Sequence, residues 1–285
     1  MGIIPIRDKS IRLITMNSFQ LSIFNRGIVI ESDGAKVQRV IALIYESLRG
    51  ESRLDLRYSV THKKGSRGFT LRRNPQESIT ASNDGELVFL LENDMTVELQ
   101  KLRSDLYFIH AAALEFRERA ILLVGPSGSG KSTTTWGLLH FGFRYLSDEL
   151  APVRLDRMEV VPYPRALCLK TTPPGGYPLP NGILQTSHTL HVPVKCMPSD
   201  AISKPTKVGV IFFLRDFSSP AVGPMRKADA ATRLFMNALN PLAHTADGLD
   251  AAIDLVENNI CFELFAGEIS ATCSLIKTTL NSLPI

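Results

Sequence analysis

Hydrophobic and polar positions in the first hundred residues follow two patterns. Short apolar stretches broken at "HKKGSRG", "NPQ" and "NDGE" are typical of β-strands, and "NRG" marks a turn between paired strands. Residues 35–50, "AKVQRVIALIYESLRG", instead carry apolar side chains at helical spacing and predict a helix that ends at Gly50. "DMTVELQKLRS" predicts a second helix that begins at Asp94. We therefore expect residues 1–103 to form a smaller β-rich N-terminal lobe.

From Tyr107 onward the pattern changes to longer apolar runs between helical segments. "YFIHAAALEF" and "AILLVG" predict neighbouring strands, and "STTTWGLLHFG" predicts a helix closed by Gly142. "FRYLSDELAPVRL" and "EVVPYPRALCL" predict a strand pair around "DRM", followed by a proline-rich loop over 171–206. "KVGVIFFL" predicts a core strand, and helices are expected at 227–239, 248–259 and 270–282 around the strand "CFELFA". This succession predicts an α/β domain with a mixed sheet over residues 104–285.

Composition narrows the class of protein. The chain has 285 residues, of which 44% are hydrophobic and 21% charged, as in ordinary globular proteins. No apolar run approaches the ~18 residues of a membrane span, and the opening "MGIIPIRDKSIRL" lacks a signal-peptide core. The four cysteines show no CxxC spacing and are expected to be reduced packing residues. We expect a cytoplasmic protein with no membrane partner.

Charge is unevenly distributed along the chain. Residues 1–75 carry 14 Lys and Arg against 6 Asp and Glu, whereas the remaining residues carry 18 against 22. This basic surplus is either a solvated face or a docking surface for an acidic peptide. Few aromatic residues are interleaved with the basic ones between Arg53 and Arg73, so nucleic acid is not an expected partner.

One motif carries a specific chemistry. "GPSGSGKS" fits the phosphate-binding pattern G-x-x-x-x-G-K-[ST] and lies between an apolar run and a helix. Glycines let the backbone aim N–H groups at phosphate oxygens, Lys131 can reach the outer phosphates and the Ser132 hydroxyl can coordinate Mg²⁺. The sequence thus predicts a nucleotide site at Gly125, Ser127, Gly128, Ser129, Gly130, Lys131, Ser132 and Thr133.

Two adjacent acids follow this motif closely. Asp148 lies 17 positions after Lys131 and is followed directly by Glu149. One acid could hold the metal while the other takes the proton of an incoming hydroxyl. Neighbouring strand residues point to opposite faces, so both serve one site only at a strand end or bulge. The alternatives are a surface ion pair with Arg144 or Arg165, or a later metal-binding acid at Asp216.

The stretch "FIHAAAL…ILLVGPSGSGKSTTTWGLLHFGFRYLSDEL" resembles the catalytic domain of HPr kinase/phosphorylase, which phosphorylates a serine of a carrier protein. The similarity covers roughly residues 107–170 and is looser to about 280. It is nearest to the HPr-kinase-related branch, which includes kinases that modify lasso-peptide precursors. The resemblance implies the fold shared by HPr kinase and phosphoenolpyruvate carboxykinase.

Site residues follow from this resemblance position by position. His110 matches the family's active-site histidine, Asp148 and Glu149 match its paired aspartates, and Arg165 matches an arginine of a later signature. The resemblance implies that these four contact the transferring phosphate, the metal and the acceptor hydroxyl. Two departures stand out: "YPRA" replaces Glu-x-Arg-Gly, which argues against the reverse phosphorolysis, and the second acid is Glu rather than Asp. Lys170 is a further residue that could reach phosphate.

These observations predict an ATP- and Mg²⁺-dependent kinase that phosphorylates a Ser or Thr hydroxyl of a peptide or small protein, with a lasso-peptide precursor as one candidate acceptor. Ser132 and Glu149 are the expected metal ligands, Asp148 the expected base, and Arg165 or His110 the expected stabiliser of charge on the phosphoryl group. The alternatives are a small-molecule hydroxyl kinase and a non-catalytic nucleotide-binding interaction protein. A donor other than ATP and a homo-oligomer are left open.

Overall fold

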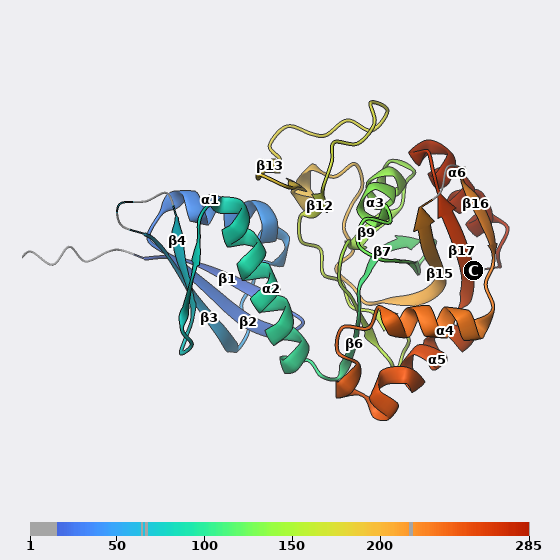
Figure 1. Ribbon diagram of the computed structural model, residues 1–285, viewed down its shortest axis with the longest axis horizontal. Helices are drawn as coiled ribbons and strands as arrows, with labels where there is room; N and C mark the ends of the chain where they lie inside the picture. The colour runs from blue at the N-terminus through green and yellow to red at the C-terminus, as the bar shows by residue number, and fades with distance from the viewer. Residues whose placement is uncertain (1–15, 64, 66–67, 217–218, 285) are drawn as a thin grey trace, which may run out of the picture.

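The N-terminal part of the chain forms a five-stranded sheet (Figure 1). The computed structural model describes residues 16–63, 65, 68–216 and 219–284. The strands follow one another in chain order across the sheet, and only β2 and β3 are parallel. They are β1 (Asn17–Ile23), β2 (Arg26–Ser32), β3 (Leu54–His62), β4 (Phe69–Arg73) and β5 (Ser78–Ala81). The predicted turn at "NRG" is confirmed, because β1 and β2 pair across it.

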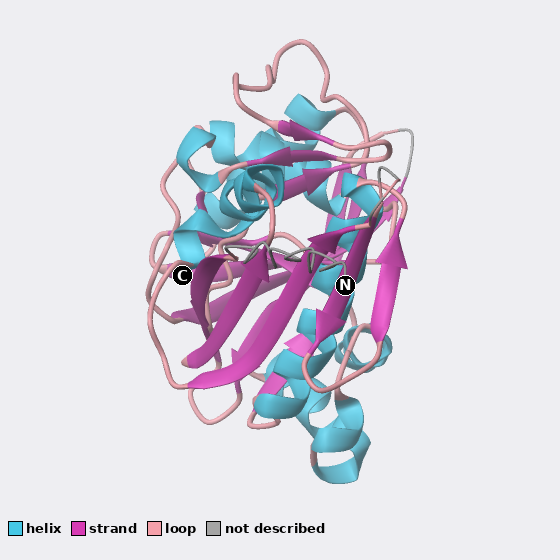
Figure 2. Cartoon of the chain, turned by 90° about the vertical axis from the view of Figure 1, so that its left-hand side faces the viewer, coloured by secondary structure: helices cyan, strands magenta, loops and turns pink. Residues whose placement is uncertain are grey.

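One face of this sheet is buried and the other is polar. In β1 the side chains of Phe19, Leu21 and Ile23 are buried whereas Ser18 and Gln20 are exposed, the alternation of a strand with one covered face. Helices α1 (Ala35–Tyr45) and α2 (Asp84–Leu102) pack on the buried face. Figure 2 shows the sheet from its uncovered side.

The helix predicted to begin at Asp94 begins ten residues earlier. The side chain of Asn83 accepts a hydrogen bond from the backbone N–H of Glu86 (3.0 Å), and the Glu86 carboxylate accepts one from that of Ser82 (2.7 Å). This reciprocal cap starts α2 at Asp84, so the "NDGE" segment is a helix start and not a break between strands. The helix predicted over 35–50 ends as α1 at Tyr45 and continues as the 3₁₀ turn η1 (Glu46–Leu48).

The second sheet is mixed, as predicted. Its strands are ordered β6-β10-β11-β15-β8-β7-β9, with β17 beside β15 and β16 beside β17. The central strand β15 runs parallel to β8 and to β17, and the other pairs are antiparallel. The bounds are β6 (Leu106–Ile109), β7 (Ala111–Phe116), β8 (Arg119–Val124), β9 (Arg144–Ser147), β10 (Ala151–Arg154), β11 (Glu159–Val160), β15 (Thr206–Asp216), β16 (Ala221–Pro224) and β17 (Ile260–Ala266).

Helices cover both faces of the mixed sheet. Along β8, Ile121 and Leu123 belong to the apolar cluster beneath α3 (Lys131–His140) and α6 (Ile269–Asn281), whereas Leu122 belongs to the cluster beneath α4 (Lys227–Met236) and α5 (Leu249–Glu257). Two short 3₁₀ turns, η3 (Pro241–Ala243) and η4 (Thr245–Gly248), connect α4 to α5. The helices predicted at 227–239, 248–259 and 270–282 are confirmed as α4, α5 and α6. Among the described residues, none of the helices could cross a bilayer.

The proline-rich segment 171–206 is not entirely loop. It contributes β13 (Leu184–Gln185) and β14 (Leu190–Val192), which form a small antiparallel sheet with β12 (Leu167–Leu169), and the 3₁₀ turn η2 (Val194–Cys196). The segment also contacts α3, where the indole N–H of Trp136 donates to the backbone carbonyl of Tyr177 (3.1 Å). It therefore packs on the helix that follows the phosphate-binding motif.

Two segments that were predicted as single strands are each broken. "YFIHAAALEF" divides into β6 and β7 at His110, and "FRYLSDELAPVRL" divides into β9 and β10 at residues 148–150. The reason is a change of partner: β6 pairs with β10, whereas β7 pairs with β9, so both breaks occur at one place in the sheet. His110 and the two acids thereby leave regular strand structure side by side. Likewise "EVVPYPRALCL" is regular only in β11 and β12. The division after residue 103 stays a prediction.

Candidate active site

The phosphate-binding motif forms the loop between β8 and α3, and its glycines are sterically required. Gly128 and Gly130 both have φ of +88°, in the left-handed region that side chains disfavour. At Gly125 a Cβ atom would lie 2.7 Å from Ser129 Oγ and 3.1 Å from the carbonyl oxygen of Leu214. The loop can therefore turn this tightly, and lie this close to β15, only with glycine at these positions.

Two polar groups are buried in this loop. Lys131, only 6% exposed, donates from Nζ to the carbonyl oxygens of Gly125 (2.7 Å) and Pro126 (3.1 Å). Burial lowers the pKa of Lys131, and the charge of Lys170 acts in the same direction. The Ser129 hydroxyl is buried and has no hydrogen-bond partner among the described residues. A buried hydroxyl left unpaired is costly to the folded state.

A cavity of about 280 Å³ opens beside the loop. The phosphate-binding loop and the first turn of α3 form one wall, and residues from three other stretches of the chain complete the lining. These are Ser127, Gly128, Gly130, Lys131, Ser132 and Thr133 on one side, with His110, Glu149, Cys168, Lys170 and Thr171 around them. Lys170 also donates a hydrogen bond to Ser127 Oγ (2.9 Å). Its ammonium therefore lies beside the loop, where the sequence predicted that it could reach phosphate. The cavity thus joins a cationic loop to one acid and one histidine.

The apolar pattern predicted that His110 would lie within a strand, and this prediction is wrong. His110 occupies the bend between β6 and β7, where its backbone N–H donates to the carbonyl oxygen of Asn237 (2.8 Å). The side chain is half-buried and lines the cavity. Burial lowers the pKa of His110, and the charge of Lys131 lowers it further. Both effects favour the neutral imidazole.

The two acids follow β9 directly and occupy different environments. Asp148 is 1% exposed, and its carboxylate accepts hydrogen bonds from the Cys168 backbone N–H (2.9 Å) and the Tyr145 hydroxyl (3.2 Å). Burial raises the pKa of Asp148 to about 7, against the opposing effect of the Arg165 charge. Glu149 is instead 46% exposed at its side chain and lines the cavity. Both acids stand beyond a strand end, which is the arrangement that lets neighbouring residues serve one site.

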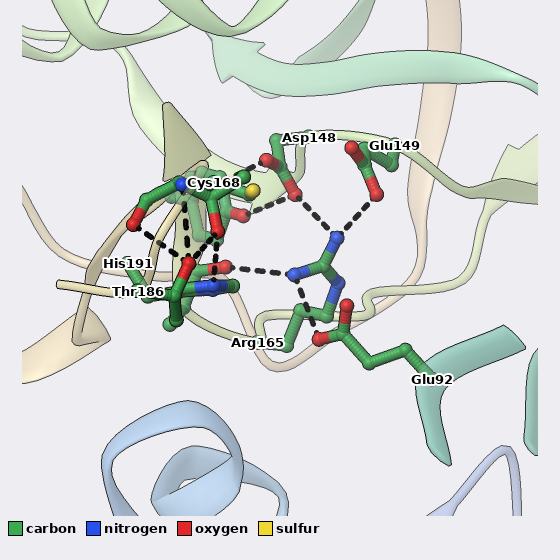
Figure 3. A network of polar contacts seen from close by, with 10 residues as sticks. Glu92, Asp148, Glu149, Arg165, Cys168, Thr186 and His191 are labelled. Carbon is green, nitrogen blue, oxygen red and sulfur yellow. Dashed lines mark hydrogen bonds and ion pairs between the residues drawn. The ribbon is translucent and has the colours of Figure 1, made fainter. Parts of the chain in front are cut away.

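Arg165 joins these acids to the N-terminal part of the chain. Its side chain is 4% exposed, and Nη2 lies 2.5 Å from Glu149 Oε2 and 3.8 Å from Asp148 Oδ1. From the other end of the guanidinium, Nη1 lies 3.2 Å from Glu92 Oε1 (Figure 3). Burial disfavours the charged guanidinium, but the three acids outweigh this effect and raise the pKa of Arg165, which stays charged.

Sequence reasoning missed Glu92. It lies in α2, 73 positions before Arg165, and no local motif surrounds it. A helix that begins at Asp94, as the pattern predicted, would exclude Glu92 altogether. The signal that could have found it is the capping pattern at Asn83, which extends the helix backward and places Glu92 within it.

The predicted site residues are therefore brought together in two layers. His110, Glu149 and most of the loop line the cavity, while Asp148 and Arg165 are bonded to one another behind Glu149. Gly125 and Ser129 belong to the loop but not to the lining of this cavity. The alternative acid, Asp216, ends β15, and its side chain lies outside the described part of the chain.

Metal binding by protein side chains alone is not indicated: within the described ranges, no group of three or more His, Cys, Asp and Glu residues is arranged to hold a metal ion. Mg²⁺ in nucleotide sites commonly has one or two protein ligands and takes the rest from phosphates and water. Ser132 and Glu149, which line the same cavity, are a donor set of that kind.

Comparison with known proteins adds little to this geometry. No family model and no curated protein matches the chain. Among solved structures, the chain is similar to the HPr(Ser) kinase/phosphatase from Coxiella burnetii, with 14% sequence identity and a TM-score of 0.32. The match covers 61% of this chain and 93% of that one. A TM-score this low transfers no activity, so the function has to be inferred from the residues of the site.

Proposed function

We propose that this chain is an ATP-dependent kinase that transfers a phosphoryl group to a Ser or Thr hydroxyl of a peptide or small protein. The observation that carries the proposal is the cavity in which a phosphate-binding loop, with Lys131 and Ser132, faces Glu149 and His110. The resemblance of this segment to HPr-kinase-related proteins agrees with it. The fold of the HPr kinase and phosphoenolpyruvate carboxykinase type is part of the same proposal.

Binding of the phosphates falls to the loop and to two lysines. The N-terminus of α3, with the backbone N–H groups of its first turn, carries a partial positive charge that favours phosphate oxygens. Lys131 donates to two loop carbonyls in this structure, and it would exchange these partners for phosphate oxygens when nucleotide binds. Lys170, already bonded to the loop at Ser127, adds a second cation on the opposite wall.

Mg²⁺ would be held by the Ser132 hydroxyl and the Glu149 carboxylate. When bound, it would neutralise charge on the phosphates during transfer. Arg165 and the metal would share the Glu149 carboxylate. When the metal binds, the contacts of Arg165 with Asp148 and Glu92 would keep the guanidinium in place. Arg165 therefore orients the acid and does not itself line the cavity.

Two groups are candidates to take the proton of the acceptor hydroxyl. A pKa of about 7 suits Asp148 to this role near neutral pH, although the carboxylate is covered in this conformation. His110 lines the cavity and burial lowers its pKa, so access and a preference for the neutral form suit it to this role. Replacing each residue separately distinguishes them, because only loss of the true base removes transfer while leaving ATP binding intact.

The basic residues of the N-terminal part of the chain are the candidate docking surface for the acceptor. Several of them pair with acids within the same part of the chain: Arg57 with Glu31, and Arg73 with Asp94 and Glu98. Arg7, Lys9, Arg12, Lys64 and Arg67 lie outside the described residues. Recruitment of an acidic acceptor by this lobe is accordingly a secondary part of the proposal, as is a lasso-peptide precursor.

The test is transfer of labelled phosphate from ATP, with Mg²⁺, to peptides encoded near the gene and, separately, to free hydroxy compounds. We expect labelled peptide. Labelling of the small compounds alone would indicate a small-molecule kinase, and ATP binding without transfer would indicate a non-catalytic nucleotide-binding protein. In Asp148→Asn and His110→Gln we expect ATP binding to persist. Full transfer in both variants would contradict both base assignments.

A further inference from the structure

The segment that carries Arg165 rests on the N-terminal lobe. The backbone N–H of Ala166 donates to the carbonyl oxygen of Ile44 in α1 (2.8 Å), and the Ser47 hydroxyl donates to that of Pro164. Tyr163 and Ala166 are buried in the same apolar cluster as the helices of that lobe. The position of Arg165 is therefore set by the N-terminal lobe as well as by the mixed sheet.

Glu92, in α2 of the N-terminal lobe, directly contacts the charged groups of the site through Arg165. Its carboxylate holds one end of the Arg165 guanidinium, whose other end contacts Glu149 and Asp148 (Figure 3). Among the described residues, the only other hydrogen-bond partner of Nη1 is the carbonyl oxygen of Ala166, at 3.2 Å. Since guanidinium is planar and rigid, fixing one end fixes the direction of the other.

We propose that Glu92 is a positioning residue for the metal-binding acid: by holding Arg165 Nη1, it keeps Nη2 beside Glu149 and leaves that carboxylate directed into the cavity. This inference rests on the proposed function, and it gives the N-terminal lobe a part in the chemistry besides any docking of the acceptor. Without Glu92, the whole charge of Arg165 is available to Asp148 and Glu149. Arg165 then competes more strongly with Mg²⁺ for Glu149.

A contribution to folding stability does not by itself explain why an acid, Glu92, lies beside Arg165. Glu92 is only 19% exposed, and burial raises its pKa while the Arg165 charge lowers it. Buried ion pairs often stabilise a protein no more than apolar residues of similar size. Glu92 instead stands behind the proposed metal ligand Glu149 through Arg165, and such outer partners commonly orient the ligand.

The experiment compares Glu92→Ala and Glu92→Gln with Glu98→Ala. Glu98 lies in the same helix and pairs with Arg73 and Lys101, away from Arg165, so it controls for the loss of an acid from α2. Measurements are kcat, KM, the Mg²⁺ concentration for half-maximal rate, and ATP affinity with and without Mg²⁺. We expect Glu92→Ala to lower kcat about tenfold or more and to raise the Mg²⁺ requirement, with Mg²⁺-free ATP affinity unchanged.

Glu92→Gln keeps an oxygen for Nη1 and should retain more activity than Glu92→Ala, whereas Glu98→Ala should match the wild type. Unchanged kcat and Mg²⁺ requirement in Glu92→Ala, or the same loss in Glu98→Ala, would overturn the inference. If the wild-type protein binds Mg²⁺–ATP without transferring phosphate, the proposed function fails, but the Mg²⁺-dependent part of ATP affinity still tests Glu92.

A measurement without nucleotide completes the test. The amide of Cys168 is held by Asp148, which Arg165 contacts, so its hydrogen exchange reports the arrangement of the charged cluster. We expect faster exchange at Cys168 in Glu92→Ala and wild-type exchange in Glu98→Ala. Equal exchange in all three proteins would contradict a positioning role, even if the chain proves to bind no nucleotide.

Discussion

Lys170 donates a hydrogen bond from Nζ to Ser127 Oγ over 2.9 Å, although 43 residues separate the two in the chain. This contact joins the end of β12 to the phosphate-binding loop between β8 and α3. Both residues line the cavity that also holds Lys131, Ser132 and Glu149. The second cation of the site therefore comes from a part of the sequence that carries no nucleotide-binding motif.

Replacing this lysine should weaken nucleotide binding without unfolding the protein. We expect Lys170→Ala to reduce ATP affinity by roughly tenfold, the effect of losing one hydrogen bond to a charged group. Because Lys170 is exposed, the free energy of unfolding should stay within about 0.5 kcal/mol of the wild type. Titration calorimetry with ATP and denaturant unfolding measure the two quantities. Lys207→Ala, an exposed lysine on β15, is the control, and equal ATP affinity in both variants would contradict a phosphate-binding role.

Lys131 should be indispensable for transfer but not for folding. Its ammonium is buried against loop carbonyls, so Lys131→Met removes a buried charge and inserts an unbranched side chain of similar length. We expect kcat to fall by about 100-fold or more, as when one preorganised donor to a reacting group is lost. Thermal unfolding without nucleotide should show no loss of stability. A variant that retains wild-type transfer would exclude this loop from phosphate binding.

The buried carboxyl of Asp148 should make stability depend on pH in an unusual direction. Its pKa is raised to about 7 in the folded protein from an ordinary value near 4, so the folded state binds the proton more tightly than the unfolded state. The contribution of Asp148 to the free energy of unfolding is therefore greatest below pH 4 and declines as the pH rises to about 7.

Asp148→Asn removes this titration. Relative to the wild type, the stability of the variant should rise by about 1 to 4 kcal/mol between pH 4 and pH 8. Denaturant unfolding of both proteins across this range measures the difference. A constant difference between them would show that Asp148 is ionised in the folded protein throughout.

The packing of α3 on α6 should tolerate no added atom at Gly137. A Cβ atom there would lie 2.6 Å from Cys273 Sγ and 2.8 Å from Ile269 Cγ1, closer than side-chain contacts allow. We expect Gly137→Ala to lower the free energy of unfolding by about 1 to 3 kcal/mol, because overpacking outweighs the better helix propensity of alanine. Gly175→Ala is the control, since nothing lies within 4 Å of a Cβ atom at that position. A Gly137→Ala protein as stable as this control would contradict the packing.

Periodicity in the sequence predicted the elements that pack by one face and the motif whose conformation is local. β15, α4, α5 and α6 appear near the expected positions, and the loop before α3 takes the glycine-dependent turn that its spacing indicates. Neither prediction requires knowledge of distant partners, because burial pattern and backbone freedom are properties of the segment itself.

The rest of the site depends on contacts that no local pattern encodes. The bends at His110 and at residues 148–150 arise because two strands change partners together, and an apolar run continues through both bends unaltered. The joining of Arg165 to Glu92 requires that helices α1 and α2 pack against the segment 163–166. A sequence pattern could therefore indicate the acids but not which of them would face the cavity.

The hydrogen bond from Trp136 to the Tyr177 carbonyl has a practical consequence. Trp136 is the single tryptophan of the chain, is 1% exposed and lies in the helix that begins at the phosphate-binding loop. Its emission therefore reads out, without any added label, whether the segment around Tyr177 stays docked on α3. A titration with nucleotide or acceptor, followed by the emission spectrum of Trp136, would show undocking of the segment as a shift of the spectrum to the red.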